Sequence, residues 1–244
     1  INMTLIKKHR KNLIKKFEFI HKKELIFIKV KKNKLSKSYK LTLDKRDLNG
    51  LVSIPYHIKY DEGAKFAKDN LDWLSEELKK FQPIIKINDG VKVKFFDHVF
   101  EIKYITSTDN KIYLTSDTIE ILSKKNHSKM LLKWIKDEVK NKSNKVISDF
   151  SQKLNVQVSK VKISNSFSYW GSCNSKNEIS INWRLIFCPQ YVLRYIIAHE
   201  LSHLIEFNHS NNFWNLVDGL IINRKDAQKW LKENENYMYR LRFD

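Results

Sequence analysis

The sequence predicts an α+β protein in which a β-rich N-terminal part is followed by a helix-rich C-terminal part. Three observations support this fold class. Short segments of alternating apolar and polar residues, separated by turn residues, dominate the first half of the chain. Two longer segments with apolar residues at helical spacing dominate the second half. The chain has 244 residues, of which 42% are hydrophobic, and this is enough to bury a sizeable core.

The N-terminal elements follow from local patterns. Strands are expected at residues 24–30, 38–43, 51–55, 91–96, 99–105 and 111–115. The first three would form a small β-meander in which the first two pair, and the last three have the lengths and turn separators of hairpin strands. Apolar residues recur every three or four positions from residue 61 to residue 81, which predicts one amphipathic helix ended by Pro83.

The C-terminal elements begin with a long helix at residues 128–154, where apolar side chains recur at helical spacing with charges between them. Two strands follow at residues 156–164 and 178–182. We therefore expect three parts, with a soft boundary near residue 120. They are a basic N-terminal extension at residues 1–20, a β-rich part with one helix at residues 21–120, and a C-terminal domain at residues 121–244.

The charge balance bears on the choice of partner. A formal net charge of +19 attracts polyanions such as nucleic acid. Most of this charge is lysine, spread in ones and twos along the chain, and arginine, the better ligand for phosphate, is scarce. The charge is therefore typical of a general compositional bias, and nucleic acid is a partner that the sequence admits without favouring.

The compartment follows from the cysteines and from the distribution of apolar residues. Cys173 and Cys188 cannot form a disulfide framework, and each is expected to be a buried thiol and not a metal ligand. The first twenty residues lack the uninterrupted apolar core of a signal peptide. No segment reaches the roughly 18 apolar residues of a membrane span. We expect a cytoplasmic protein with no membrane partner, and its oligomeric state is left open.

The residues that carry chemistry follow Pro189. Proline suits the first turn of a helix, and the chain beyond it is apolar as far as Phe207. His199 and His203 are four residues apart, so they lie on one helical face where both imidazoles can bind one metal ion. Glu200 lies about 100° around the helix from the first histidine, beside the metal without ligating it. This is the position of a general base.

A catalytic zinc site needs a third protein ligand and an open position for water. His209 is the favoured candidate because it follows His203 by six residues, and because Asn208 accepts the left-handed conformation that ends a helix and turns the chain back. Glu206 is the alternative, because it returns to the helical face of His199. It lies far along the helix axis, at about 1.5 Å per residue, so we expect it to contact a ligand imidazole instead.

A His-Glu-x-x-His pattern also arises by chance on surface helices. Here it lies on a strongly apolar helix, where a carboxylate and two imidazoles without partners would be costly to bury. A metal ion explains the cluster, and Zn2+ suits it best, although imidazole also binds other transition metals.

The chemistry that follows is metal-assisted hydrolysis of peptide bonds. Zinc lowers the pKa of its bound water and polarises a carbonyl, while Glu200 takes the water proton. Peptides or partly unfolded proteins are the expected substrates. The alternative is a catalytically silent module in which the zinc is structural and the basic surface binds nucleic acid or a protein partner.

Separated motifs of the second half resemble those of one family. In order along the chain they are Trp170-Gly171-Ser172-Cys173, Ile179-Ser180-Ile181-Asn182-Trp183-Arg184-Leu185, Pro189, His199-Glu200-Leu201-Ser202-His203, Asn208-His209-Ser210 and Phe213-Trp214. This set is similar to that of the YgjP-like zinc metallopeptidases. The resemblance covers about residues 25–237 and is weaker in the N-terminal part. Members of that family often have a basic residue where this chain has Tyr169. Any role of that basic residue in substrate binding is therefore not expected in this chain.

The resemblance implies a small gluzincin-like metallopeptidase domain at residues 121–244, with the His-Glu-x-x-His helix packed on a small sheet. It also implies that His199, His203 and His209 bind zinc and that Glu200 is the catalytic acid and base. It gives no physiological substrate.

Other residues near these motifs have less specific roles. Trp170 and Trp214 are expected to belong to the core, with a place in the wall of a substrate pocket as the alternative. For Arg184 we expect an ordinary surface ion pair and not a contact with substrate. The strand at residues 178–182 is a candidate edge strand that would pair with an extended peptide substrate.

Overall fold

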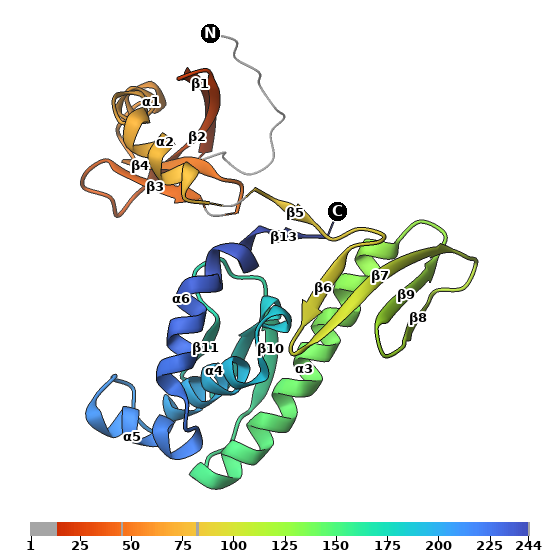
Figure 1. Cartoon of the computed structure of the whole chain (residues 1–244). Coiled ribbons are helices and arrows are strands. Elements are labelled where there is room, and N and C mark those ends of the chain that lie inside the picture. The colour runs from red at the N-terminus through yellow and green to blue at the C-terminus, as the bar shows by residue number, and fades with distance from the viewer. Residues whose placement is uncertain (1–13, 45, 82, 244) are drawn as a thin grey trace. The chain divides into compact units, whose positions relative to one another are not determined.

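The computed structural model describes residues 14–44, 46–81 and 83–243. The fold is α+β, as the sequence predicts. In these residues the chain forms six α-helices and several small sheets (Figure 1).

The chain forms two compact units, one ending at Gln82 and one beginning at Pro83. This division differs from the expected boundary near residue 120. The strands between residues 92 and 123 belong to the second unit because their buried side chains share one hydrophobic core with the helices that follow them.

The first unit combines one sheet with two helices. Its elements are β1 (Ile14–His21), β2 (Glu24–Asn33), β3 (Lys40–Asp44), β4 (Asn49–Pro55), α1 (Tyr60–Asp69) and α2 (Leu71–Lys79). The strand order is β1-β2-β4-β3. The expected β-meander is wrong, because β2 and β4 are parallel neighbours and β3 pairs with β4 alone. This register places Val52 beside Val30, and both side chains are fully buried in the core of the unit.

β1 lies partly within the stretch expected to be a basic extension. The sequence predicts no element before residue 21, whereas β1 begins at Ile14. Phe17 and Phe19 alternate with charged residues and pack against the core of the first unit, and this apolar row accounts for the strand. Residues 1–13 of the expected extension lie outside the described residues.

The single helix expected at residues 61–81 is two helices. Asn70 separates α1 from α2 and leaves helical geometry, with φ −116° and ψ 19°. Its side-chain amide donates to the carbonyl oxygen of Phe66 at 2.8 Å. The side chain therefore satisfies a carbonyl that the interrupted helix leaves without its usual partner.

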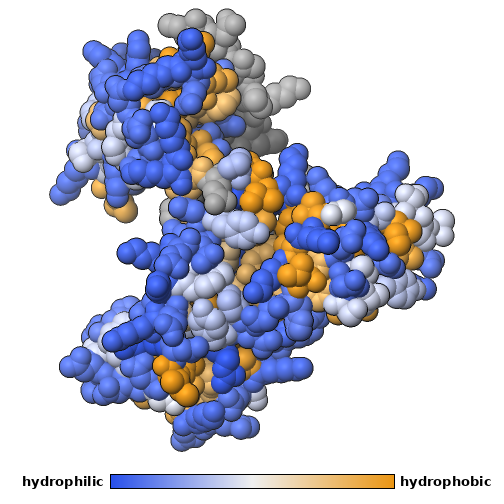
Figure 2. Space-filling model, in the orientation of Figure 1, coloured by the Kyte–Doolittle hydropathy of each residue, from blue (hydrophilic) through white to orange (hydrophobic). Residues whose placement is uncertain are grey.

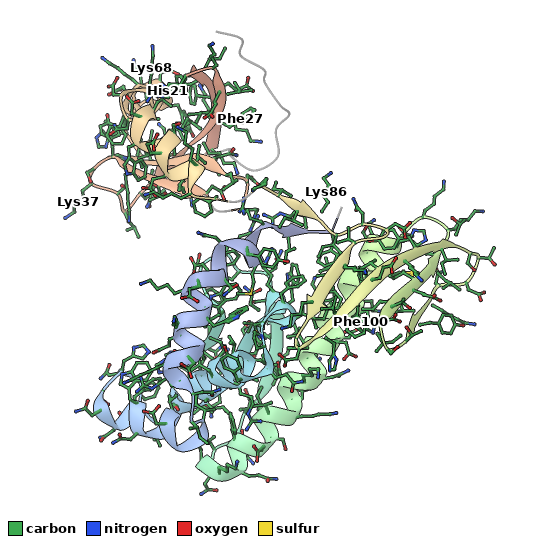
Figure 3. All side chains as sticks on the ribbon, viewed as in Figure 1. His21, Phe27, Lys37, Lys68, Lys86 and Phe100 are labelled. Atoms are coloured by element: carbon green, nitrogen blue, oxygen red, sulfur yellow. The ribbon has the colours of Figure 1, made fainter. Side chains whose placement is uncertain are left out.

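The sheet of the first unit has one face that is less covered. Phe27 of β2, whose side chain points away from the buried Ile26 and Ile28, is 41% exposed (Figure 3).

The second unit opens with β5 (Ile85–Lys86), β6 (Lys92–Phe95), β7 (His98–Thr106), β8 (Lys111–Leu114) and β9 (Thr118–Ser123). β6 and β7 form the expected hairpin. β7 and β8 do not pair, because β9 lies between them in the order β6-β7-β9-β8. β9 was not predicted, although its Ile119 and Ile121 are fully buried. Phe100 of β7 packs near Phe95 of β6, with ring centroids 6.1 Å apart (Figure 3).

The remaining elements are α3 (His127–Leu154), β10 (Lys160–Ser164), β11 (Gly171–Cys173), β12 (Glu178–Asn182), the short 3₁₀ helix η1 (Trp183–Phe187), α4 (Gln190–Ser202), α5 (Asn211–Leu220), α6 (Arg224–Arg240) and β13 (Leu241–Arg242). β13 pairs in parallel with β5. The long helix and the strand β12 agree with the sequence prediction.

The three-stranded sheet of the second unit has the order β10-β12-β11. β12 is parallel to β10 and antiparallel to β11. The expectation that residues 178–182 form an edge strand is therefore wrong, because both edges of β12 are paired. β11 is an edge strand instead, and it packs against α4.

α4 is the central helix of the second unit. Figure 1 shows it between α3 and α6, and it contacts both. Ile197, Ala198 and Leu201 are fully buried, which explains why apolar residues occur all around this helix. A helix enclosed in this way holds its few polar side chains in fixed positions.

The surface agrees with the composition. Within the described residues, no helix combines the length and the apolar character needed to cross a membrane. The visible face is mostly hydrophilic, with smaller apolar areas between the charged side chains (Figure 2).

Candidate metal centre

α4 carries the first residues of the predicted site. It begins after Pro189, as the sequence predicts, and its last residue is Ser202. His199 and Glu200 therefore lie in its final turn. His199 is half-buried and Glu200 is only 6% exposed. The burial comes from the elements that enclose α4, so it is a property of the tertiary structure.

His203 is the C-cap residue directly after α4, whereas the apolar run predicts a helix as far as Phe207. Its ring still lies near that of His199, with centroids 4.9 Å apart. Nδ1 of His203 is 3.0 Å from the backbone carbonyl oxygen of Glu206. A neutral imidazole that donates this bond from Nδ1 keeps its Nε2 lone pair for a metal ion. The expected contact between Glu206 and a ligand imidazole is present, but the carbonyl makes it and not the carboxylate.

His209 reaches the cluster from the segment between α4 and α5. Its Nε2 is 3.1 Å from Nε2 of His199. The backbone of Asn208 is not left-handed, contrary to the expectation from the sequence. The chain is instead held at the start of α5, where the hydroxyl of Ser210 accepts a hydrogen bond from the amide of Phe213 at 3.3 Å.

The three histidines fit a zinc ion. One nitrogen from each of His199, His203 and His209 lies within 4.8 Å of the other two. Zinc binds imidazole at about 2.0–2.1 Å, so two nitrogens of a tetrahedral site are roughly 3.3 Å apart. The 3.1 Å separation of two of them is close to this value. The carboxylate of Glu206 is not part of the cluster.

Burial favours the neutral, metal-binding form of two of the imidazoles, those of His199 and His203. Burial, and then the charges of His203 and His209, lower the pKa of His199 to about 4. Burial also lowers the pKa of His203. Nδ1 of His199 is buried and has no hydrogen-bond partner among the described residues. The protonated form of this ring is therefore strongly disfavoured.

Glu200 is placed by burial and by close approach of a strand. Burial raises its pKa to about 7. A Cβ atom added at Gly171 in β11 would lie 2.6 Å from Oε1 of Glu200 and 2.7 Å from its Cγ. The absence of a side chain at this position therefore leaves the space that the carboxylate occupies. Gly171 belongs to a motif that the sequence shows, but the motif does not predict this contact.

A recess of about 280 Å³ opens beside Glu200 and His199. Its other walls come from Trp170, Gly171, Tyr195, Ile196, Gln228 and Leu231. The hydroxyl of Tyr195 accepts a hydrogen bond from the amide of Gln228 at 3.1 Å, which links α4 to α6. Sequence spacing could have predicted that Tyr195 lies near the site, because it precedes His199 by four residues and so shares its helical face. No sequence pattern brings Gln228 to the recess.

The two tryptophans are half-buried and pack against the core of the second unit, as expected. Trp170 also forms part of the recess wall. Of the thiols, Cys188 is fully buried and Cys173 is half-buried. Neither belongs to the histidine cluster.

The expected surface position of Arg184 is wrong. This residue is only 2% exposed. Its guanidinium carbon lies 4.2 Å from the ring centre of Phe167 and 4.3 Å from that of Trp183. Its Nη1 donates to the side-chain oxygen of Asn165 at 2.8 Å. Aromatic faces and an amide oxygen take the place of water around the charge, which lets the arginine be buried.

The model of the YgjP-like metallopeptidase domain matches residues 37–234 of this chain. The chain belongs to the YgjP-like metallopeptidase family. The match includes the whole histidine cluster, Glu200 and β11. It begins inside the first unit, somewhat later than the start of the likeness inferred from the sequence.

Other comparisons add little to this assignment. Among solved structures, the chain is similar to the metallopeptidase zymogen of Pyrococcus abyssi abylysin, with 18% identity, 37% of this chain and 93% of that chain covered, and a TM-score of 0.34. This likeness is too limited to carry an argument. No curated protein matches the chain.

Proposed function

We propose that this chain is a zinc-dependent peptidase whose metal is held by His199, His203 and His209 and whose catalytic base is Glu200. The observation that best supports this proposal is the convergence of three imidazoles beside a single buried carboxylate. Structural zinc sites usually have four protein ligands. Three ligands leave room for water or for a substrate carbonyl, so the cluster suits catalysis better than structural support.

Zinc, when bound, supplies a Lewis acid that lowers the pKa of a water molecule and polarises a carbonyl group. Glu200 accepts the proton of the attacking water and later returns it to the leaving amine. In the metal-free protein burial raises the pKa of this carboxyl group to about 7, and a bound zinc ion would favour the carboxylate, the form that accepts a proton. Gly171 leaves the carboxylate room to face the recess.

The substrate we propose is an extended peptide or an unfolded segment of a protein. β11 is an edge strand that adjoins Glu200, so a peptide paired with it would run past the recess. This role replaces the one expected for residues 178–182. The two unpaired thiols, Cys173 and Cys188, suit a reducing compartment, and we propose that the protein acts in the cytoplasm.

The proposal is tested with purified wild-type protein and a Glu200→Gln variant. Both are expected to bind about one zinc ion per chain, because Glu200 is not a ligand, and only the wild type is expected to cleave a denatured protein or a mixed peptide pool. Glu206→Gln is the matched control, since it removes the neighbouring carboxylate that lies outside the cluster, and it should cleave like the wild type.

Two outcomes would overturn the proposal. Wild-type protein that binds no zinc, even after reconstitution, would exclude the metal site. Zinc binding without cleavage by either protein would favour the alternative of a silent binding module, for which the charge of +19 suggests a polyanionic partner.

A further inference from the structure

His209 is the least supported of the three histidines. His199 lies in an enclosed helix, and Nδ1 of His203 is oriented by the carbonyl of Glu206. His209 is exposed and lies in a segment between helices. Its ring makes no hydrogen bond to any described residue other than His199. Metal-binding histidines are usually oriented through their second nitrogen, so something else must hold this ring.

Two consecutive aromatic residues of α5 form a corner around the ring of His209. The ring of Phe213 meets it edge-on, with centroids 4.7 Å apart and planes at 82°. The ring of Trp214 stacks on it, with centroids 5.6 Å apart and planes at 25°. Phe213 is fully buried and fixed by the core, whereas Trp214 is only half-buried. The position of His209 therefore depends on what holds Trp214.

Arg224, the first residue of α6, holds Trp214. Its guanidinium carbon lies 4.6 Å from the centre of the Trp214 ring. Asp218 fixes the guanidinium by accepting two hydrogen bonds, from Nε at 2.6 Å and from a terminal nitrogen at 2.9 Å. Asp218 lies one helical turn after Trp214 on α5. A bidentate pair restricts the orientation of the planar guanidinium far more than a single contact would.

We propose that Arg224, fixed by Asp218, positions Trp214 against His209 and thereby sets the affinity of the site for its metal ion. Arg224 and Asp218 are positioning residues that act through Trp214. This inference rests on the proposed metal site, but not on peptidase activity. When the pair is lost, the tryptophan and the imidazole can rotate, and part of the metal-binding energy is used to order them again.

The test measures the affinity of the full-length, metal-free protein for Zn2+ by competition with a chromophoric chelator. Arg224→Gln and Asp218→Asn should each weaken zinc binding roughly 10- to 100-fold, the usual effect of losing a group that orients a ligand. Arg224→Lys should also weaken binding, because lysine keeps the charge but lacks the planar fork. Lys229→Gln is the control, since it removes an exposed charge elsewhere on α6, and it should bind like the wild type.

A double-mutant cycle separates positioning from a general structural effect. In a His209→Ala background, Arg224→Gln should cause no further loss of zinc affinity, because no third imidazole remains to be positioned. Asp218→Asn should give the same result, and it serves as a second variant if Arg224→Gln folds poorly.

Three results would overturn the inference. They are wild-type zinc affinity in Arg224→Gln, an equal loss of affinity with and without His209, and wild-type protein that binds no zinc. Coupling between Arg224 and His209 in a protein that cleaves no peptide would support the inference while refuting the proposed peptidase function.

Discussion

Burial acts in opposite directions on two adjacent residues of the site. It lowers the pKa of His199 to about 4 and raises the pKa of Glu200 to about 7. Both shifts favour the uncharged form of the side chain in the metal-free protein. A bound cation would reverse the preference at Glu200, because an opposite charge stabilises the carboxylate. The enclosed end of α4 is thus suited to the protein with its metal ion bound.

The raised pKa of Glu200 predicts a pH-dependent penalty in the metal-free protein. Between pH 4.5 and about pH 7 the folded protein holds a proton on Glu200 that the unfolded chain has lost, so the unfolding free energy falls as the pH rises through this window. Glu200→Gln lacks this penalty. The unfolding free energy of Glu200→Gln minus that of the wild type should therefore increase across the window by roughly 3 kcal/mol, at about 1.36 kcal/mol per pKa unit. Above the window the difference should stay constant.

Urea unfolding with a metal chelator present, at several pH values, measures this difference. His199 contributes with the opposite sign, because its lowered pKa makes stability rise with pH between about 4 and 6.5, but it is common to both proteins. A difference that stays constant from pH 4.5 to pH 7.5 would mean that Glu200 is not held neutral by burial.

At the scale of elements, the site depends on how closely β11 approaches α4. Spacing on one helix predicts the neighbourhood of His199, Glu200 and His203. It cannot predict that an edge strand passes so near the carboxylate that only glycine fits. The apolar run also predicts an end of α4 that is later than the observed end at Ser202. The apolar run continues to Phe207, but the chain must leave the helix earlier to return His209 to the cluster.

Gly171→Ala tests the approach of β11 to α4. The new methyl group would lie 2.6 Å from Oε1 of Glu200, so the carboxylate must move. We expect the rate of peptide cleavage to fall at least about tenfold, since a small displacement of a catalytic group is enough to cause such losses. The zinc affinity should stay close to that of the wild type, because no ligand is displaced.

Gly219→Ala is the matched control for this substitution. A Cβ atom at this helical position would meet nothing within 4 Å. The control should cleave normally and be slightly more stable than the wild type, by about 0.5–1 kcal/mol. Normal cleavage by Gly171→Ala would show that the close approach does not constrain Glu200.

At the scale of the whole molecule, the residues that the structure describes form two separate hydrophobic cores. One consists of residues of the first unit only, and the other contains the apolar residues around the histidine cluster. All four proposed site residues belong to the second unit. Substitutions in the core of the first unit should therefore affect its own stability and leave the metal site intact.

Leu74→Ala tests this independence. Leu74 is fully buried in the core of the first unit, so its truncation should cost that unit about 2–5 kcal/mol. Hydrogen exchange followed by mass spectrometry should detect faster exchange before residue 82 and little change after it, with unchanged zinc affinity. Leu131→Ala, at an equally buried position in the second unit, should give the reverse pattern. Equal destabilisation of both units by either variant would refute the independence.

The sequence by itself determined the elements whose residue pattern is local. These include the long helix α3, the strand β12, and the helix that carries His199 and Glu200. The hypothesis that His209 completes the set also came from sequence spacing, and the structure brings this residue to the other two. Helical periodicity is local, so one sequence is enough to recognise it.

Only the tertiary structure decided the features that join distant segments. Strand order is one example, because alternation of apolar and polar residues makes a strand without specifying its neighbour. The sequence did not predict the parallel pairings of β2 with β4 and of β7 with β9. The burial of Arg184, the contact of Gly171 with Glu200 and the support of Trp214 by Arg224 are others. Each depends on which side chains packing brings together, and that is a property of the folded chain and not of any one segment.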